Sequence, residues 1–133
     1  QRAERELLEM STERDKIQEV SQCLSLADIE QFRKQSAEVV ASESLLDYVQ
    51  RLIAFTRGKA DYHIGLSPRG SLAMMRAAKT WALMSGRNHV IPEDLQTILP
   101  AVVAHRLRGI SDDEGSSGLA LVQRMLNEVD VID

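Results

Sequence analysis

The stretch from Gly65 to Arg87 constrains the fold most, because it carries signals for both ends of one helix. Ser67 can accept a hydrogen bond from a first-turn N–H group, and Pro68 suits the first helical position. Gly86 is placed to end the helix in a left-handed conformation. Apolar residues lie most of the way round between these ends: Leu72, Ala73, Met74, Met75, Ala77, Ala78, Trp81, Ala82, Leu83 and Met84. This distribution predicts a helix buried at the centre of a bundle.

Arg69 does not fit this pattern. It falls in the first turn of the predicted helix, where the helix dipole disfavours a cation. An arginine beside unpaired N–H groups is what a phosphate-binding site needs. The alternative is that Arg69 pairs with an acidic side chain or points to water, and position alone favours this alternative.

Composition indicates a helical protein that does not bind nucleic acid broadly. The 133 residues suffice for one domain or for a piece of a larger protein, and 44% of them are hydrophobic and 27% charged. Only 4% are aromatic, while Ala, Leu, Glu, Gln, Arg and Met abound, which favours an all-α fold. The net charge of -4 argues against a protein that neutralises many phosphates.

Location is constrained more weakly. Cys23 is the one cysteine, so no intrachain disulfide can form, which suits a reducing cytoplasm. We expect this thiol to be a small core residue. The apolar runs are far shorter than the roughly 20 residues that span a bilayer, so we expect no membrane segment. Because the chain starts at Gln1 in a charged helical pattern, we expect it to be a segment of a longer protein.

Apolar spacing predicts further helices along the chain. After a short helix over Glu4–Met10, Ser25 and Asp28 form a capping pair for a helix that ends near Val40. Its apolar positions are Leu26, Ile29, Phe32 and Val39. The next helix starts at Ser42 or Ser44 and ends near Arg57.

The second half of the chain continues this pattern. Pro92 opens a helix with Glu93 and Asp94 in its first turn, and Pro100 should kink this helix or split it in two. A last helix begins at Ser116 or Ser117, after an acidic loop. Tyr62, Ile64 and Leu66 alternate, which is compatible with one short extended piece. The fold class is therefore all-α, a bundle of about five to six helices with at most a short extended pairing.

No complete catalytic or metal-binding motif is present. The nearest approach to a phosphate-cradling loop, Gly58-Lys59, has Ile53 in place of the first glycine and Ala60 in place of Ser or Thr. The histidines, His63, His89 and His105, are far apart and have no ligand spacing. We therefore expect no catalytic residue and no metal site in this chain alone, and no ATP hydrolysis by it.

Several runs together resemble the C-terminal lid of MoxR-type AAA+ ATPases. They are Gly65-Leu66-Ser67-Pro68-Arg69-Gly70-Ser71-Leu72, Arg76-Ala77-Ala78, Trp81-Ala82, Gly86-Arg87, Val90, Pro92-Glu93-Asp94-Leu95 and His105-Arg106-Leu107. Arg5-Glu6-Leu7-Leu8, Tyr48-Val49 and Thr56-Arg57 look like further landmarks of that family. The resemblance covers about residues 3–108. One departure is Gly70, which stands where the family more often has Ala.

The resemblance implies that Arg69 is the sensor-2 arginine, which reaches from the lid to the γ-phosphate of ATP. Ser67 and Pro68 would fix the helix start. ATP and Mg²⁺ would be held by the full-length protein, whose phosphate loop and metal-binding acids would precede residue 1. The resemblance implies residues 1–24 as a lead-in from the ATPase core and 25–108 as the lid. Residues 109–133, an acidic loop and a helix packing on the lid, follow from the apolar pattern alone.

The same resemblance implies partners and a function. The partners are the ATPase core of the same chain, neighbouring subunits in a hexameric ring, and a protein with a von Willebrand A domain. The net charge and the short apolar runs lead us to expect no nucleic-acid and no membrane partner. The function is chaperone-like remodelling or maturation of partner proteins, driven by ATP hydrolysis in the cytoplasm. A free-standing helical interaction module without a nucleotide role remains the alternative. A third interpretation is a basic stripe of Arg69, Arg76 and Arg87 that binds DNA, and the net acidity opposes it.

Overall fold

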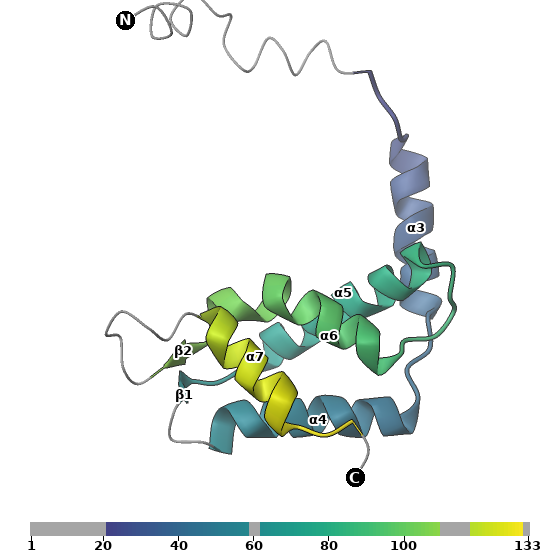
Figure 1. The fold of residues 1–133 in the computed structure, drawn as a ribbon. Helices are drawn as coiled ribbons and strands as arrows, with labels where there is room; N and C mark the ends of the chain where they lie inside the picture. Colours follow the sequence, from purple (N-terminus) through teal and green to yellow (C-terminus); the bar gives the residue numbers. More distant parts are fainter. Residues whose placement is uncertain (1–20, 59–61, 110–117, 132–133) are drawn as a thin grey trace, which may run out of the picture. The chain divides into compact units, whose positions relative to one another are not determined.

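The computed structural model describes residues 21–58, 62–109 and 118–131. The chain divides into two compact units, residues 1–32 and 33–133. The described elements are α3 (Leu26–Glu38), α4 (Glu43–Gly58), β1 (Tyr62–Ile64), α5 (Pro68–Met84), α6 (Pro92–Val103), the 3₁₀ turn η1 (Ala104–Arg106), β2 (Arg108–Gly109) and α7 (Gly118–Glu128) (Figure 1). β1 and β2 form one antiparallel pair. The predicted all-α fold with a short extended pairing is confirmed. The helix predicted over 4–10 and the start predicted at Ser116 or Ser117 lie outside the described residues.

The helix α3 begins as predicted and buries less than predicted. The Ser25 N–H and Oγ donate to the Asp28 carboxylate at 2.7 and 2.6 Å, and the Asp28 N–H donates to Ser25 Oγ at 3.1 Å. The two donations from the Ser25 Oγ and N–H groups hold the pKa of the Asp28 carboxylate below its ordinary value. Leu26, Ile29 and Phe32 are exposed, however, and no residue of α3 is buried.

Cys23 is also exposed, so its predicted core position is wrong. It precedes α3, and none of the residues 21–32 is buried. Without buried neighbours this thiol has no core to join.

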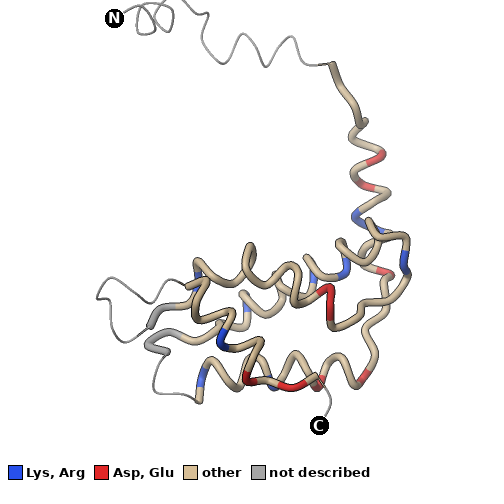
Figure 2. Tube along the Cα trace, viewed as in Figure 1, with Lys and Arg blue, Asp and Glu red and all other residues tan. Residues whose placement is uncertain are grey.

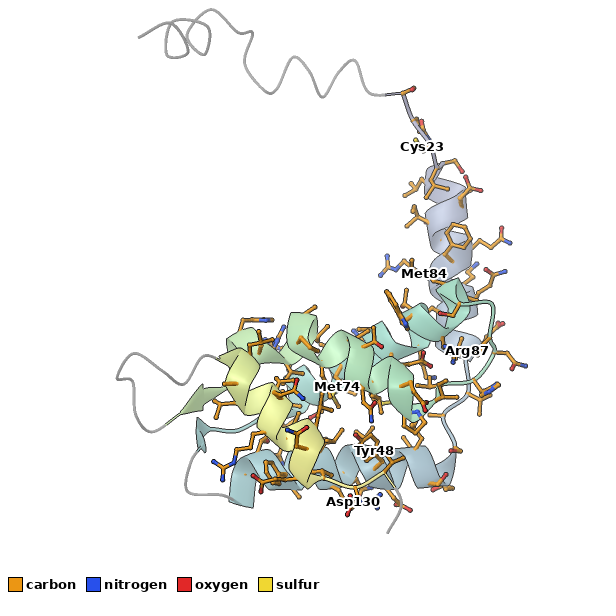
Figure 3. All side chains as sticks on the ribbon, in the orientation of Figure 1. Cys23, Tyr48, Met74, Met84, Arg87 and Asp130 are labelled. Atoms are coloured by element: carbon orange, nitrogen blue, oxygen red, sulfur yellow. The ribbon has the colours of Figure 1, made fainter. Side chains whose placement is uncertain are left out.

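The core of the second unit lies between α4, α5, α6 and α7. α5 and α6 make the most extensive helix–helix contact, and α7 packs against α6, η1 and α4. Figure 3 shows Met74 of α5 and Tyr48 of α4 inside this unit, and both side chains are fully buried. The core consists of Val39, Leu45, Tyr48, Val49, Leu52, Leu66, Met74, Ala78, Ala82, Val90, Leu95, Ile98, Leu99, Val103, Leu107, Leu121, Val122, Met125 and Val129.

Apolar residues most of the way round α5 predicted a helix buried at the bundle centre, but the structure buries this helix along one face only. Only a stripe spaced four residues apart is buried: Gly70, Met74, Ala78 and Ala82. Residues at this spacing share one face of a helix, and three of these four are small, so α6 can pack closely there. Leu72, Trp81 and Met84 are exposed on other faces.

The C-terminal end of α5 is closed as the sequence indicates. Gly86 has φ 73°, in the left-handed region that glycine adopts without strain. Its N–H donates to the Leu83 carbonyl and the Arg87 N–H donates to the Ala82 carbonyl, both at 2.9 Å. This pair of bonds is the Schellman motif, and it turns the chain out of the helix.

The chain then joins two segments that are far apart in sequence. The Val40 N–H donates to the Asn88 carbonyl and the Val90 N–H donates to the Val40 carbonyl, each at 2.9 Å. The resulting parallel bridge between Val40 and His89 ties the segment after α3 to the segment after α5.

Pro100 does not split α6, so this alternative of the prediction is wrong. The helix runs without a break from Pro92 to Val103. Pro100 leaves the Gln96 carbonyl without its helical donor, since proline has no N–H. The buried residues Leu95, Leu99 and Val103 on either side of Pro100 hold the helix against the core.

Candidate functional site

The N-terminus of α5 is built by its first residues. The Gly70 N–H donates to Ser67 Oγ at 3.2 Å, so Ser67 is the N-cap, and Pro68 occupies the first turn. The Ser71 Oγ donates to the Ser67 carbonyl at 3.2 Å. Together these contacts define where the helix begins and fix the path of the backbone up to Arg69.

The Arg69 side chain extends from this first turn into solvent. It is exposed, and within residues 21–58, 62–109 and 118–131 no carboxylate pairs with it. The ion pair with an acidic side chain is therefore absent from this part of the chain, whereas a side chain that points to water, the other form of the alternative, fits the exposure of Arg69. A guanidinium is always charged and presents donors that match phosphate oxygens, so Arg69 is available to bind an anion supplied from outside the described residues.

The residue before the N-cap is held by two side chains of α4. The Leu66 N–H donates to Thr56 Oγ1 at 3.0 Å. The Leu66 carbonyl accepts from Arg57 Nε at 3.1 Å and from Arg57 Nη2 at 2.9 Å. We call Thr56, Arg57 and Leu66 the Leu66 clasp. It connects the last turn of α4 to the start of α5.

Gly65 lets the two segments approach closely. A Cβ atom at this position would lie 2.5 Å from the Thr56 carbonyl oxygen, a contact that the backbone cannot relieve without moving. Gly70 also leaves room, because a Cβ atom there would lie 2.8 Å from Leu66 Cδ1. The Leu66 side chain is buried and packs onto the first turn of α5 at this point.

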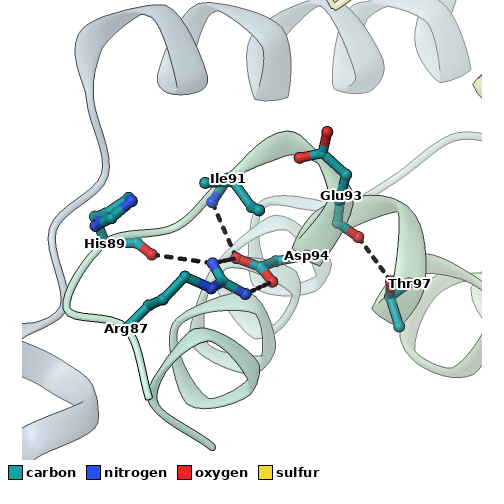
Figure 4. Close-up of polar contacts among 6 residues, drawn as sticks. All are labelled: Arg87, His89, Ile91, Glu93, Asp94 and Thr97. Carbon is teal, nitrogen blue, oxygen red and sulfur yellow. Dashed lines mark hydrogen bonds and ion pairs between the residues drawn. The ribbon is translucent and has the colours of Figure 1, made fainter. Parts of the chain in front are cut away.

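The turn after α5 contains an ion pair with one buried partner (Figure 4). Arg87 Nη1 donates to Asp94 Oδ2 at 2.7 Å, and Arg87 Nη2 donates to Asp94 Oδ1. Asp94 Oδ2 also accepts from the Ile91 N–H at 2.9 Å, which is half of a capping box at the start of α6. Asp94 is 2% exposed, and these three donors satisfy a carboxylate that water scarcely reaches.

The pair shifts both pKa values. The hydrogen bonds from Arg87 hold the pKa of Asp94 below its ordinary value, and burial opposes them. The same bonds raise the pKa of Arg87. Arg87 is therefore committed to Asp94 and is not a free member of a basic stripe with Arg69 and Arg76. Figure 2 shows lysines and arginines on several helices, with acidic residues between them.

His89 and His105, two further candidate residues, lie in separate parts of the fold. His89 Nδ1 lies 3.1 Å from Asn88 Oδ1, and His105 is exposed at η1. The side chain of His63 lies outside the description. Within the described residues, no three side chains of His, Cys, Asp or Glu are grouped so that they could hold a metal ion. Nor does any described helix combine the length and the apolar character that a bilayer crossing needs.

A family of known proteins matches more than half of the chain. The AAA lid domain family covers residues 54–125, from the end of α4 to the middle of α7. The chain belongs to the AAA lid domain family. The match includes the Leu66 clasp, Ser67, Pro68, Arg69 and the Arg87–Asp94 pair, and it extends past Leu107, where the sequence resemblance ended.

Relatives of this lid domain include MoxR proteins. Chaperone MoxR1 of Mycobacterium tuberculosis is 35% identical over 98 residues, which are 67% of this chain and 26% of that protein. The uncharacterized protein YeaC of Bacillus subtilis is 29% identical over 130 residues, which are 96% of this chain and 41% of that protein. The resemblance to MoxR-type lids is thus confirmed, and the chain spans less than half the length of these relatives.

A solved structure has a similar fold. The crystal structure of a "putative ATPase" from Cytophaga hutchinsonii superposes with a TM-score of 0.70 and 28% sequence identity. The match covers 78% of this chain and 35% of that one.

Sequence reasoning missed two parts of the site in this lid domain. Thr56 and Arg57 were noticed as landmarks, but their contact with Leu66 joins residues ten and nine positions apart across a loop. Local spacing does not reveal such a contact. Asp94 had a usable signal, because it is the third residue of α6, the position at which the acid of a capping box reaches back to the N-cap N–H.

Proposed function

We propose that this chain is the lid of a MoxR-type AAA+ ATPase, in which Arg69 senses the γ-phosphate of ATP bound by another domain. One observation carries the proposal. Arg69 is an exposed guanidinium on the capped first turn of α5, without a carboxylate partner in the described residues, inside the segment that matches the family. Such a group can bind phosphate oxygens in two places at once.

In this function the chain supplies one donor to a shared site. The Arg69 guanidinium suits the phosphate groups of ATP. Mg²⁺ needs oxygen ligands, and the described residues contain no acidic cluster that suits it. In the proposed function, the ATPase domain holds the metal ion and the phosphate cradle. Arg69 stabilises negative charge on the transferring phosphoryl group, and loss of that group after hydrolysis releases the lid.

The proposed role of the full-length protein is the one that its MoxR-type relatives suggest. The full-length protein works as a ring of subunits, in a hexamer, in the cytoplasm. It uses ATP hydrolysis for chaperone-like remodelling or maturation of partner proteins, including ones with von Willebrand A domains. The similarity to chaperone MoxR1 supports this role. The scattered basic residues and the net charge of -4 support a role without nucleic acid.

The test is ATP turnover by the full-length protein with Arg69→Ala. We expect turnover to fall by about 10²–10³-fold, because one preorganised donor to the developing charge is lost. Since Arg69 is exposed, the melting temperature should not change. Arg76→Ala is the matched control, because Arg76 is exposed on the same helix two turns later. Wild-type turnover by Arg69→Ala would refute the proposal.

The alternative, a free-standing helical interaction module, is favoured by the exposed apolar side chains Leu72, Trp81 and Met84 on α5. The two functions differ in what precedes the lid in the gene. A phosphate loop within the preceding couple of hundred codons supports the ATPase lid, and its absence supports the module.

A further inference from the structure

We propose that Thr56 and Arg57, through the Leu66 clasp, are positioning residues for Arg69. This inference rests on the proposed function, because it concerns the same phosphate-sensing site. The clasp holds both polar groups of the Leu66 backbone, its N–H by Thr56 and its carbonyl by Arg57. Leu66 lies three residues before Arg69.

The Thr56 hydroxyl has one available orientation. It donates its proton to the Ile53 carbonyl at 2.8 Å, so an oxygen lone pair remains for the Leu66 N–H at 3.0 Å. Thr56 is 1% exposed, and water cannot compete for these bonds. A buried hydrogen bond that loses its partner leaves a polar group unsatisfied, which makes this contact costly to break.

Little freedom remains between the clasp and Arg69. Ser67 is fixed by its bond to the Gly70 N–H, and Pro68 has a φ angle set by its ring. The Cα atom of Arg69 is therefore placed relative to α4 by the clasp, and only its side-chain torsions stay free. Gly65 supports this geometry, because only a residue without a Cβ atom allows the loop to lie so close to Thr56.

Position matters for a phosphate sensor. A misplacement of about 1 Å can reduce an enzymatic rate by about 10²-fold, because the donor no longer meets the developing charge. Loss of the clasp lets the first turn of α5 shift relative to α4 while the rest of the core stays packed. Breaking the clasp should thus lower turnover through Arg69, in addition to the stability lost with the buried hydrogen bond.

The experiment measures kcat and KM for ATP in the full-length protein with Thr56→Val, Thr56→Ser and Arg57→Ala. Thr56→Val keeps the shape and removes the hydroxyl, so kcat should fall by about 10–100-fold with a smaller change in KM. Thr56→Ser keeps the hydroxyl and should restore turnover to near the wild-type rate. Thr97→Val is the matched control, because the Thr97 hydroxyl donates to the Glu93 carbonyl at 2.7 Å on an exposed part of α6.

The deciding arm combines Thr56→Val with Arg69→Ala. If Thr56 acts through Arg69, the double variant turns over no more slowly than Arg69→Ala alone. If the two losses multiply, or if Thr56→Val has wild-type kcat, the inference is overturned. Should Thr56→Val not fold, Arg57→Ala takes its place in the same double-variant comparison, because Arg57 is exposed.

Failure of the proposed function itself gives a different result. In that case Arg69→Ala alone has wild-type turnover. When Arg69→Ala has reduced turnover while Thr56→Val and Arg57→Ala have wild-type turnover, the function stands and the positioning role of the clasp is refuted.

Discussion

The carboxylate of Asp94 makes three hydrogen bonds at the start of α6, two with Arg87 and one with the Ile91 backbone. A single residue thereby joins the turn after α5 to the first turn of the next helix. Changing the carboxylate to an amide leaves the guanidinium without its anion, and an NH2 group then replaces one acceptor oxygen, so one of these donors loses its acceptor. At the scale of single residues, the loss of this buried polar contact should therefore be measurable.

We expect Asp94→Asn to lower the free energy of unfolding by about 1–3 kcal/mol at neutral pH. Because the pKa of Asp94 is lowered in the folded protein, the unfolded chain binds more protons than the folded chain as the solution becomes acidic. The stabilisation is complete above the ordinary pKa of 3.8 and is lost as the pH falls through the folded pKa. Urea unfolding from pH 7 to acid measures both effects.

Glu93→Gln provides the control, because Glu93 is an exposed acid in the same first turn. Its stability difference from the wild type should be small across the pH range. A constant gap between Asp94→Asn and the wild type down to the most acidic point would contradict the pH dependence.

At the scale of helices, Gly86 ends α5 with a backbone conformation that other residues adopt at a cost. We expect Gly86→Ala to destabilise the protein by about 1 kcal/mol, the cost of a left-handed residue with a Cβ atom. No atom lies within 4 Å of such a Cβ, so the loss is due to the backbone alone. Denaturant titration of the variant measures it.

Gly58→Ala is the companion variant, since Gly58 also has open space around it but no positive φ. It should be neutral or slightly stabilising, because alanine loses less entropy on folding. Equal destabilisation by the two changes would show that the handedness of Gly86 is not the cause.

Helix ends could be predicted from the sequence, whereas the burial of α3 and α5 could not. Ser25, Ser67 and Gly86 act through bonds to residues within five positions, so a local pattern contains the whole interaction. Burial depends on which other element arrives. Leu72 and Ala78 are both apolar residues of α5, but only Ala78 is buried. Arg69 stood out because its charge opposed the helix dipole, whereas Thr56 gave no such local signal.

At the scale of the whole molecule, the described residues of the second unit form one core that α4, α5, α6 and α7 share. Met74 is fully buried in this core. We expect Met74→Ala to cost about 2–5 kcal/mol, because it removes buried surface and leaves a cavity. The unfolding midpoint in urea measures the loss.

Met84→Ala is the control for Met74→Ala, because it makes the same substitution in the same helix. Met84 differs in burial, since it is 76% exposed (Figure 3). Its effect should stay within about 0.5 kcal/mol. A similar loss for both variants would mean that the apolar end of α5 is covered in the protein in solution.

The ladder of β1 and β2 has a consequence for the order of folding. It pairs Ile64 with Arg108, so α5 and α6 lie inside a closed loop of chain. Closing a long flexible loop costs entropy that a two-strand pair recovers poorly. Packing of α5 on α6 shortens that loop before the strands meet. The helices α5 and α6 should thus pack together first. The strands β1 and β2 should pair afterwards and close a loop whose helices are already packed.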